Sequence, residues 1–568
     1  MKKLIVGLTM AAISLSCWAI PAKQGLWKNI RLADGTEVRA QLSGDEHIHF
    51  WRTTDGRCFV ENEQGVYRPV APDEVRRRAD SRRPKLNSNR LRNMKKVAMG
   101  QRTHYLGKKK GLVILAQFTD VKFKTADSLG LYKRILNEEG FTEEKFIGSV
   151  SDYFKAQSAG QFELDFDVVG PYTLAQNQKY YGKNDSQGND QHAEEMIIEA
   201  CQQADEEVDF ADYDWDGDGE VDQVFVLYAG KGEADGGPSY SIWPHMYTLT
   251  ECNQSLTLDS IKIDTYACSN EITPNGSIEG IGCFCHEFSH CMGFPDFYDV
   301  AYNGWFGMSD FDLMCSGSYN GNTFCPAGYT AHEKMMCGWQ EPILLSDNDT
   351  TVTDLQPMSK NGQTFIIYND AHPDEYFTIE NRQKSGWDAS YPAKGLMVSH
   401  VDFDLAIWAV NCPNTEITTS SEQYTDYNYP LNDHQRMTIL HADDNDDSQF
   451  WNSYYGGYTY KTLSTDLYPC KENDSLTATS SPAAELYHEN SKGTTTVSWA
   501  ILNIKQNTDG TMSFTYRAPV ANEDENTGIL SVATPVQRRQ QLFTLSGQQV
   551  EKAGKGIYIK NKKKYILR

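Results

Sequence analysis

The alternation of apolar and polar residues predicts several distinct parts along the chain. Residues 23–70 alternate in polarity between DG and QG turns, which is typical of a small β-unit. An apolar run from Gly111 predicts a buried strand that opens a second part. After about residue 345, short β-type runs are separated by Asp, Asn, Pro and Gly. That pattern predicts a β-sandwich-like part.

The second part mixes helix and strand patterns. Residues 146–170 predict a helix, a stop at Gly160 and a strand, and residues 222–230 predict another strand. A helix is expected from His192, and a later one is expected to end near Gly293. Helical spacing places five residues on one face of the helix from His192: Ala193, Met196, Ile197, Ala200 and Cys201. The expected fold is multidomain, with an α/β part followed by β structure.

Charge is distributed unevenly along the chain. The net charge is −24, yet residues 76–110 contain 14 Lys or Arg and a single acid. This basic stretch has little periodicity, so it predicts a linker with little structure beside an acidic body. It is either a solvated linker or a removable segment attracted to that body. A largely acidic chain repels phosphate, which argues against nucleic acid as a partner.

The N-terminal sequence MKKLIVGLTMAAISLSCWA predicts a secretory signal peptide that is cleaved after Ala19. Cys17 raises a lipoprotein alternative, but Ser14 stands where that signal usually has leucine. No later segment is apolar and long enough to span a bilayer. The protein is therefore expected to be secreted or associated with the cell surface. The remaining cysteines, even in number, permit disulfides in an exported chain.

The stretch IGCFCHEFSHCMGFPDFYD, residues 281–299, has the spacing of a catalytic zinc site. His286 and His290 lie four apart on one helix face, and Glu287 can reach a water on the metal. Gly293 permits a turn that returns Asp296 as a third ligand, which leaves a fourth position open. A buried helix with hydrogen-bonded histidines is the structural alternative. Cys283 is an alternative ligand, although Asp296 is favoured.

A second motif lies downstream, where SDFDLMCSGSYNG places Met314 eighteen residues after Asp296. The combination resembles the metzincin-like metallopeptidases, which have a methionine turn beneath the zinc. More specifically, HExxHxxGxxD with a DLM-x-SGS turn resembles the immune inhibitor A family, as do residues 149–170 and 375–402. The resemblance covers roughly residues 40–515. It implies that His286, His290 and Asp296 bind zinc, that Glu287 is the catalytic acid/base and that Met314 is the turn methionine.

The resemblance implies a secreted zinc metalloendopeptidase, made as a zymogen, that cleaves peptide bonds of extracellular proteins through a zinc-activated water. Tyr319 and Tyr329 are both candidates to hold the oxyanion. Proteins and peptides would be substrates, and an Arg- or Lys-specific protease would cut at 76–78 or 82–83. Cys58 or a nearby Asp is a candidate for blocking the zinc in the latent form. The alternatives are a surface adhesin or glycan-binding protein with a degenerate protease domain, and a cysteine protease, for which no nucleophile signature is present.

The stretch DYDWDGDGEVD, residues 212–222, predicts a calcium site, which the resembled family also implies. Its candidate ligands are Asp214, Asp216, Asp218, Glu220 and Asp222. Phe225 occupies the twelfth place, where an EF-hand has a bidentate glutamate, so a complete EF-hand is not expected. The alternative is a solvated acidic turn.

Together these patterns divide the chain into five segments. They are a signal peptide (1–19), a small β-rich propeptide with its basic linker (20–106), a metzincin-like α/β zinc-protease domain (107–345), a β-sandwich-like domain (346–518) and a short β-tail (529–568). Residues 519–528 form a polar linker before the tail. The tail resembles C-terminal sorting domains of the type IX secretion pathway; the alternative is a small accessory β-module.

Overall fold

The computed structural model describes most of residues 20–519 and four strands of the tail. The gaps before residue 519 are 47, 63–64, 83–93, 95–104, 186–187, 303, 419–430, 447–449, 453–456 and 460–462. The described residues up to 519 belong to one compact unit, and the described residues of the tail belong to a second. The predicted signal peptide, with Cys17, and Arg83 lie outside the described residues, as does nearly all of the polar linker.

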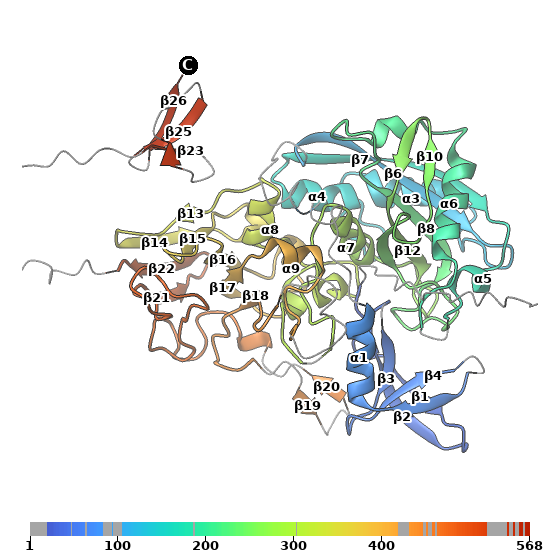
Figure 1. Cartoon of the computed structure of the whole chain (residues 1–568), viewed down its shortest axis with the longest axis horizontal. Helices are drawn as coiled ribbons and strands as arrows, with labels where there is room; N and C mark the ends of the chain where they lie inside the picture. The colour runs from blue at the N-terminus through green and yellow to red at the C-terminus, as the bar shows by residue number, and fades with distance from the viewer. Residues whose placement is uncertain are drawn as a thin grey trace, which may run out of the picture. The chain divides into compact units, whose positions relative to one another are not determined.

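The N-terminal part is a five-stranded antiparallel meander followed by a helix (Figure 1). Its strands are β1 (Trp27–Arg31), β2 (Glu37–Gly44), β3 (His49–Arg52), β4 (Cys58–Glu61) and β5 (Tyr67–Val70). The prediction of little structure in the basic stretch is wrong at its start, where α1 (Pro72–Arg82) forms. Proline and two acids begin this helix, and Arg78 pairs with Glu74 one turn earlier, at 2.7 Å. Local helix signals therefore outweigh the clustered positive charge.

The α/β part is built on a mixed sheet in the order β7-β6-β8-β12-β9. Its strands are β6 (Gly107–Gln117), β7 (Phe162–Thr173), β8 (Val224–Lys231), β9 (His245–Thr248) and β12 (Thr265–Ile272). Only β9, at one edge, is antiparallel to its neighbour. The helices are α3 (Ser128–Asn137), α4 (Val150–Gln157), α5 (Gln178–Gly182), α6 (Ala193–Ala204), α7 (Gly282–Cys291) and α8 (Ala331–Met336). The strands and helices predicted from residues 111, 146–170, 192 and 222–230 are all present.

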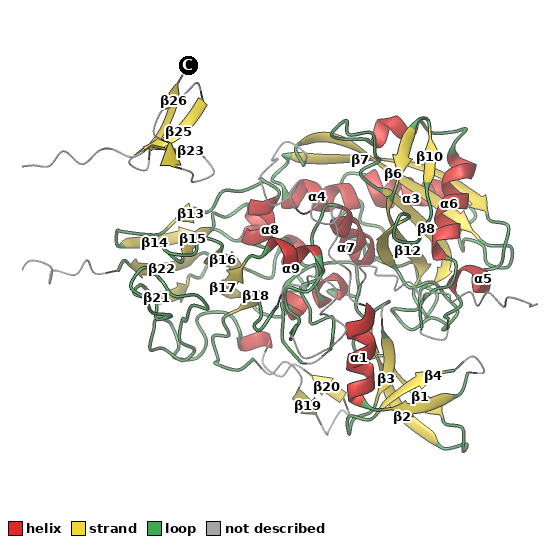
Figure 2. Cartoon of the chain, in the orientation of Figure 1, coloured by secondary structure: helices red, strands yellow, loops and turns green. Residues whose placement is uncertain are grey.

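Successive residues of β6 face opposite sides of this sheet, so two cores form. Leu112 and Ile114 pack in the core that contains α6, and all five apolar residues predicted for one face of that helix are buried. Val113 and Leu115 pack in the other core with residues of α3, α4 and α7. Figure 2 shows the helices and strands of this part of the protein. The second core therefore positions the helix that carries the HExxH motif.

The region after residue 345 forms two further sheets. One has the order β13 (Ile343–Leu344), β15 (Phe365–Tyr368), β16 (Glu375–Arg382), β17 (Gly395–Asp402), β18 (Met437–Ile439). The other has the order β14 (Thr350–Leu355), β22 (Met512–Arg517), β21 (Ala500–Gln506). Phe377 and Ile379 of the first sheet share a core with Phe514 of the second. On the opposite face, Tyr376 joins the core of α7, so packing is continuous across the predicted boundary at 345.

The remaining elements are short. They are the hairpin β10 (Leu256–Leu258) and β11 (Ile261–Ile263), the pair β19 (Phe450–Asn452) and β20 (Gly457–Thr459), and helix α9 (Leu405–Ala409). The tail forms a separate sheet, β24 (Gln549–Val550), β23 (Leu542–Thr544), β25 (Gly556–Lys560), β26 (Lys563–Leu567). Its role in sorting stays a prediction. None of the described helices combines the length and the apolar character that crossing a bilayer requires.

Candidate metal centre

Helix α7 carries the HExxH motif inside the protein. Residues 282–290 are all buried, which is expected of a helix that is apolar on nearly every side. Phe284 and Phe288 pack in the core beneath the sheet. At Gly282, a Cβ atom would come within 1.9 Å of the Ser318 carbonyl oxygen. Glycine at this position allows the 3-10 helix η3 (Ser316–Tyr319) to pack against the start of α7.

The turn after α7 explains how the third ligand returns to the helix. Gly293 has φ of 94°, and its N–H donates to the His290 carbonyl at 2.8 Å. The Phe294 N–H donates to the Ser289 carbonyl at 3.2 Å. These two bonds form a Schellman motif, in which glycine adopts the left-handed conformation that ends the helix. The chain then reverses, and Asp296 reaches the histidines.

His286, His290 and Asp296 bring three donor atoms to one point. The two Nε2 atoms lie 3.1 Å apart, and Asp296 Oδ1 lies 3.2 Å from His286 Nε2 and 3.4 Å from His290 Nε2. Zn²⁺ with bonds of about 2.0–2.1 Å would hold tetrahedral ligands about 3.3 Å apart. The three side chains are buried and form one of the groups able to hold a metal ion. The residues present therefore fit zinc.

The backbone fixes both imidazole rings. The Nδ1 atom of His286 lies 2.7 Å from the Leu313 carbonyl oxygen, and that of His290 lies 2.7 Å from the Phe294 carbonyl oxygen. A carbonyl can only accept, so each Nδ1 carries the proton and each Nε2 presents a lone pair. Burial lowers the pKa of His290, which favours the same neutral form. Two facing lone pairs beside a carboxylate favour a bound cation.

The predicted methionine turn supports this centre through its backbone. Leu313 supplies the carbonyl that orients His286, and the Met314 carbonyl accepts from the Phe297 N–H at 2.7 Å. The Met314 N–H donates to Asp312 Oδ1 at 2.6 Å, which fixes the turn. Met314 itself is buried in the core with α7. The turn therefore joins the first histidine to the segment of the third ligand.

Glu287 projects from the same helix and is fully buried. Burial raises its pKa well above the usual range, and the charge of Asp296 adds to the increase. Burial also opposes ionisation of Asp296, but positive charge and hydrogen-bond donation from the two imidazoles, which require their protonated form when no cation is bound, outweigh it and lower the pKa of Asp296 to about 2. The two carboxyl groups thus differ in proton affinity. Asp296, with the lowered pKa, suits a metal ligand. Glu287, with the raised pKa, suits a group that takes up and releases a proton.

The N-terminal segment lies on Glu287. The Ile20 N–H donates to Glu287 Oε1 at 2.9 Å, and the Trp243 indole N–H donates to the Ile20 carbonyl at 2.9 Å. The Tyr319 hydroxyl donates to the Pro21 carbonyl at 2.7 Å. Residues 20 and 21 of the N-terminal part, which are in an irregular segment, therefore contact both Glu287 and Tyr319.

Glu46, in the connection between β2 and β3, brings another carboxyl group toward the centre. Burial raises its pKa well above the usual range, and the neighbouring Asp45 raises it further. The charges of Asp296 and Glu287 act in the same direction. Sequence analysis did not identify Ile20 or Glu46, because neither has a local motif.

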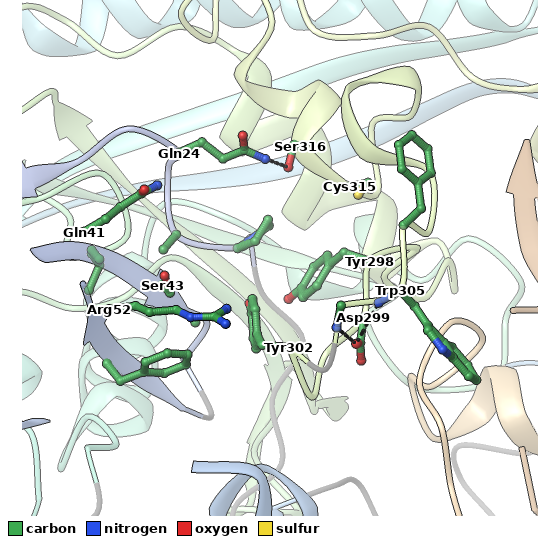
Figure 3. Close-up of a pocket in the computed structure, with 17 residues that line it drawn as sticks. Gln24, Gln41, Ser43, Arg52, Tyr298, Asp299, Tyr302, Trp305, Cys315 and Ser316 are labelled. Carbon is green, nitrogen blue, oxygen red and sulfur yellow. Dashed lines mark hydrogen bonds between the residues drawn. The ribbon is translucent and has the colours of Figure 1, made fainter. Parts of the chain in front are cut away.

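A cavity of about 110 Å³ lies beside residues 20–22, between the N-terminal part and the α/β part. Figure 3 shows Arg52 on one side and Tyr298 and Tyr302 on the other. Gln24 crosses the boundary and donates to the Ser316 hydroxyl at 3.2 Å. Nearby, the His49 ring stacks on Trp243 with centroids 5.1 Å apart. The N-terminal part therefore contacts the α/β part beside the centre.

The other residues that the sequence suggested for this site are not part of the group formed by His286, His290 and Asp296. Cys283 packs with Ile20 and Trp243 and is not in the metal-binding group. Cys58 lies in a separate apolar cluster and is not in that group either. The Tyr329 hydroxyl meets Ser289 in the core, at 2.5 Å, whereas Tyr319 meets the peptide segment. The 12 cysteines that follow Cys17 are all among the described residues, and no disulfide joins any two of them.

Only three of the five predicted calcium ligands lie close enough together to share a cation. Asp214, Asp216 and Asp218 form a group able to hold a cation. Glu220 instead pairs with Lys262 at 3.3 Å, and Asp222 accepts a hydrogen bond from the Trp215 N–H. These two residues are outside the group. Calcium binding therefore stays a prediction.

Comparison with known proteins bears directly on this centre. Residues 108–339 match the family model "Immune inhibitor A peptidase M6, catalytic domain". The chain is 29% identical over 215 residues to pre-pro-metalloprotease PrtV of Vibrio cholerae, covering 33% of this chain and 23% of PrtV. It is 25% identical over 237 residues to immune inhibitor A of Bacillus thuringiensis, covering 35% of this chain and 34% of that protein.

The predicted resemblance to the immune inhibitor A catalytic domain is therefore confirmed for residues 108–339, and the comparisons support a metalloprotease. This chain spans between about a quarter and a third of the length of these relatives.

Proposed function

We propose that this protein is a secreted zinc metalloendopeptidase, made as a zymogen, that hydrolyses peptide bonds of extracellular proteins. The observation that carries the proposal is the convergence of three donor atoms, from His286, His290 and Asp296, beside an intact buried Glu287. The family match of the surrounding segment supports the same activity.

His286, His290 and Asp296 would hold the zinc, and one coordination position would stay open for water or substrate. When bound, zinc supplies a Lewis acid that polarises the scissile carbonyl and makes water more acidic. Glu287 accepts the proton of the attacking water and passes it to the departing amine. Its raised pKa suits the second half of this task, because the carboxyl group then retains its proton until the amine needs it.

Tyr319 is the better of the two tyrosines for holding the carbonyl oxygen of a substrate. Its hydroxyl already donates to the peptide carbonyl of Pro21, next to the residue that contacts Glu287. Tyr329 is 0% exposed, and its hydroxyl contacts Ser289 and Met292 instead. A substrate strand in place of residues 20–22 would therefore meet Tyr319.

The same contacts support latency. Ile20 is 1% exposed, and its N–H donates to Glu287 Oε1, one of the two oxygens that would take the proton of the attacking water. Glu46 rather than Cys58 brings a side chain of the N-terminal part toward the centre. Activity would then require removal of the N-terminal part after cleavage in the basic stretch.

The two alternative functions are less well supported. A degenerate protease domain in an adhesin would not need Glu287, yet this residue and all three proposed ligands are retained. A cysteine protease needs a thiol with a lowered pKa. Burial instead raises the pKa of Cys283 and of Cys285 well above the usual range.

Removal of the metal tests the proposed function. Hydrolysis of casein by the purified, processed protein is expected to stop in 1,10-phenanthroline and to return when zinc is added, because the chelator competes with the three ligands. Atomic absorption before and after treatment reports the zinc content. Hydrolysis that continues after the zinc has gone would refute the proposal, and zinc-loaded protein without hydrolysis would favour the adhesin alternative.

Calcium binding at residues 214–218 is a separate proposal. Millimolar calcium is expected to raise the unfolding temperature by about 2–5 °C, since binding to the folded state alone stabilises it. The variant with Asp216→Asn and Asp218→Asn should lose this increase. Asp212→Asn is the control, because Asp212 pairs with Lys110 outside the group. An equal increase in all three proteins, measured by calorimetry, would contradict the site.

A further inference from the structure

The third proposed ligand is held by a residue outside the segment that matches the peptidase family. Asn411 Nδ2 donates to Asp296 Oδ2 at 2.7 Å, and the Asp296 N–H donates to Asn411 Oδ1 at 2.6 Å. Both residues are buried and lie 115 positions apart. The Asn411 carboxamide is therefore hydrogen-bonded to both the side chain and the backbone of Asp296.

The two oxygens of Asp296 are thereby given different partners. Oδ1 faces the two imidazoles, at 3.2 Å and 3.4 Å, whereas Oδ2 faces Asn411. A hydrogen bond to the second oxygen orients a carboxylate ligand and draws charge away from that oxygen. It favours coordination through Oδ1 alone, which keeps a position open for water or substrate.

The backbone explains why asparagine suits position 411. Asn411 follows α9 and has φ of 59°, in the left-handed region that asparagine tolerates better than most residues. The Asn411 N–H donates to the Trp408 carbonyl at 3.0 Å, so the end of the helix fixes the backbone. With the backbone of Asn411 fixed in this way, its side chain makes the hydrogen bonds to Asp296.

Residues 411–415, the clamp loop, hold the whole segment that follows the third ligand. Asn414 Nδ2 donates to the Phe297 carbonyl at 2.9 Å, and Thr415 Oγ1 accepts from the Val300 N–H at 2.9 Å. Phe297, Trp408 and Cys412 share one core. The loop and the ligand segment therefore pack as one piece.

We infer that Asn411 is a positioning residue of the metal centre, and that through this one residue the β-rich region after residue 345 becomes a necessary part of the active site. The inference rests on the proposed function and deepens it. Residues 108–339, the segment that matches the family, contain the ligands but not the residue that orients the third one.

The test compares two variants of the full chain with a matched control. Asn411→Gly removes the carboxamide without strain, because glycine accepts the left-handed backbone. Asn411→Asp keeps the shape but replaces the donor with a second carboxylate. Asn414→Ala is the control: it removes bonds from the same buried loop to the Phe297 and Met437 carbonyls, but none to Asp296.

Zinc affinity is measured by competition with a chromophoric chelator, and cobalt(II) absorption reports the coordination of the substituted metal. We expect Asn411→Gly and Asn411→Asp to bind zinc about 10- to 100-fold more weakly than the parent, with an altered cobalt spectrum. Asn414→Ala should lower the unfolding temperature but keep the affinity and the spectrum of the parent.

Parental zinc affinity and an unchanged spectrum in Asn411→Gly would overturn the inference while leaving the proposed function intact. Equal losses of affinity in Asn411→Gly and Asn414→Ala would also overturn it, because the loop would then act only through stability. A parent protein that binds no zinc would refute the proposed function itself, so the two failures are distinguishable. If Asn411→Gly folds poorly, Asn411→Asp gives the same comparison.

Discussion

Replacing Glu287 by glutamine is expected to lower kcat/KM for peptide hydrolysis by about 10²- to 10⁴-fold while zinc stays bound. Glutamine has nearly the same size and can still accept a hydrogen bond, but it cannot take up the proton of the attacking water. Glu287 is not among the three converging donors, so its replacement should leave the metal in place. Hydrolysis of a quenched fluorescent peptide and zinc analysis of the same sample measure both effects.

Glu279→Gln is the matched control for this experiment. Glu279 is also a largely buried glutamate, and it lies three residues before α7, where it accepts from the Thr323 hydroxyl away from the proposed ligands. Its replacement should leave the rate near that of the parent. A Glu287→Gln protein that cleaves peptide at the parent rate would remove the basis for the proposed mechanism. Loss of zinc together with activity would instead assign Glu287 a role in metal binding.

Cleavage in the basic stretch is expected to raise peptidase activity by at least about 100-fold. In the uncut chain, a substrate must displace Ile20 and its hydrogen bonds to Glu287 and Trp243, as well as the bond from Tyr319 to Pro21. Three such bonds and a buried isoleucine amount to about 3 kcal/mol or more, which corresponds to about 100-fold in occupancy. Limited digestion with an Arg-specific protease, followed by size-exclusion chromatography, separates the two parts for assay.

N-terminal sequencing of the active species should find a new start between residues 76 and 107. The Glu287→Gln chain, digested in the same way, shows how much hydrolysis comes from the activating protease. Uncut chain that hydrolyses the peptide as fast as the separated catalytic part would show that residues 20–22 do not block the centre.

The proposed metal ligands can be found from the sequence for a local reason. His286, Glu287 and His290 are related by helix geometry, and Gly293 allows the return of Asp296 within a few residues. Such relations depend only on neighbouring residues, so spacing predicts them. The buried face of α6 follows for the same reason.

The contacts that complete the site could not be predicted in this way. Ile20 lies 267 positions from Glu287, and Asn411 lies 115 positions from Asp296. Neither contact leaves a periodic pattern, and an asparagine two residues before a proline, after a short helix, is typical of an ordinary turn. Cys58 was a candidate for blocking the zinc because a thiol can bind this metal. The strand that carries Cys58 instead places it in an apolar cluster.

X-ray absorption at the zinc edge of the purified protein tests the central claim most directly. Coordination by His286, His290 and Asp296 predicts a first shell of nitrogen and oxygen alone at about 2.0–2.1 Å, with the outer-shell scattering of two imidazoles. The variant with His290→Ala should lose one imidazole contribution. A sulfur shell at about 2.3 Å, or a spectrum unchanged in that variant, would contradict the proposed centre.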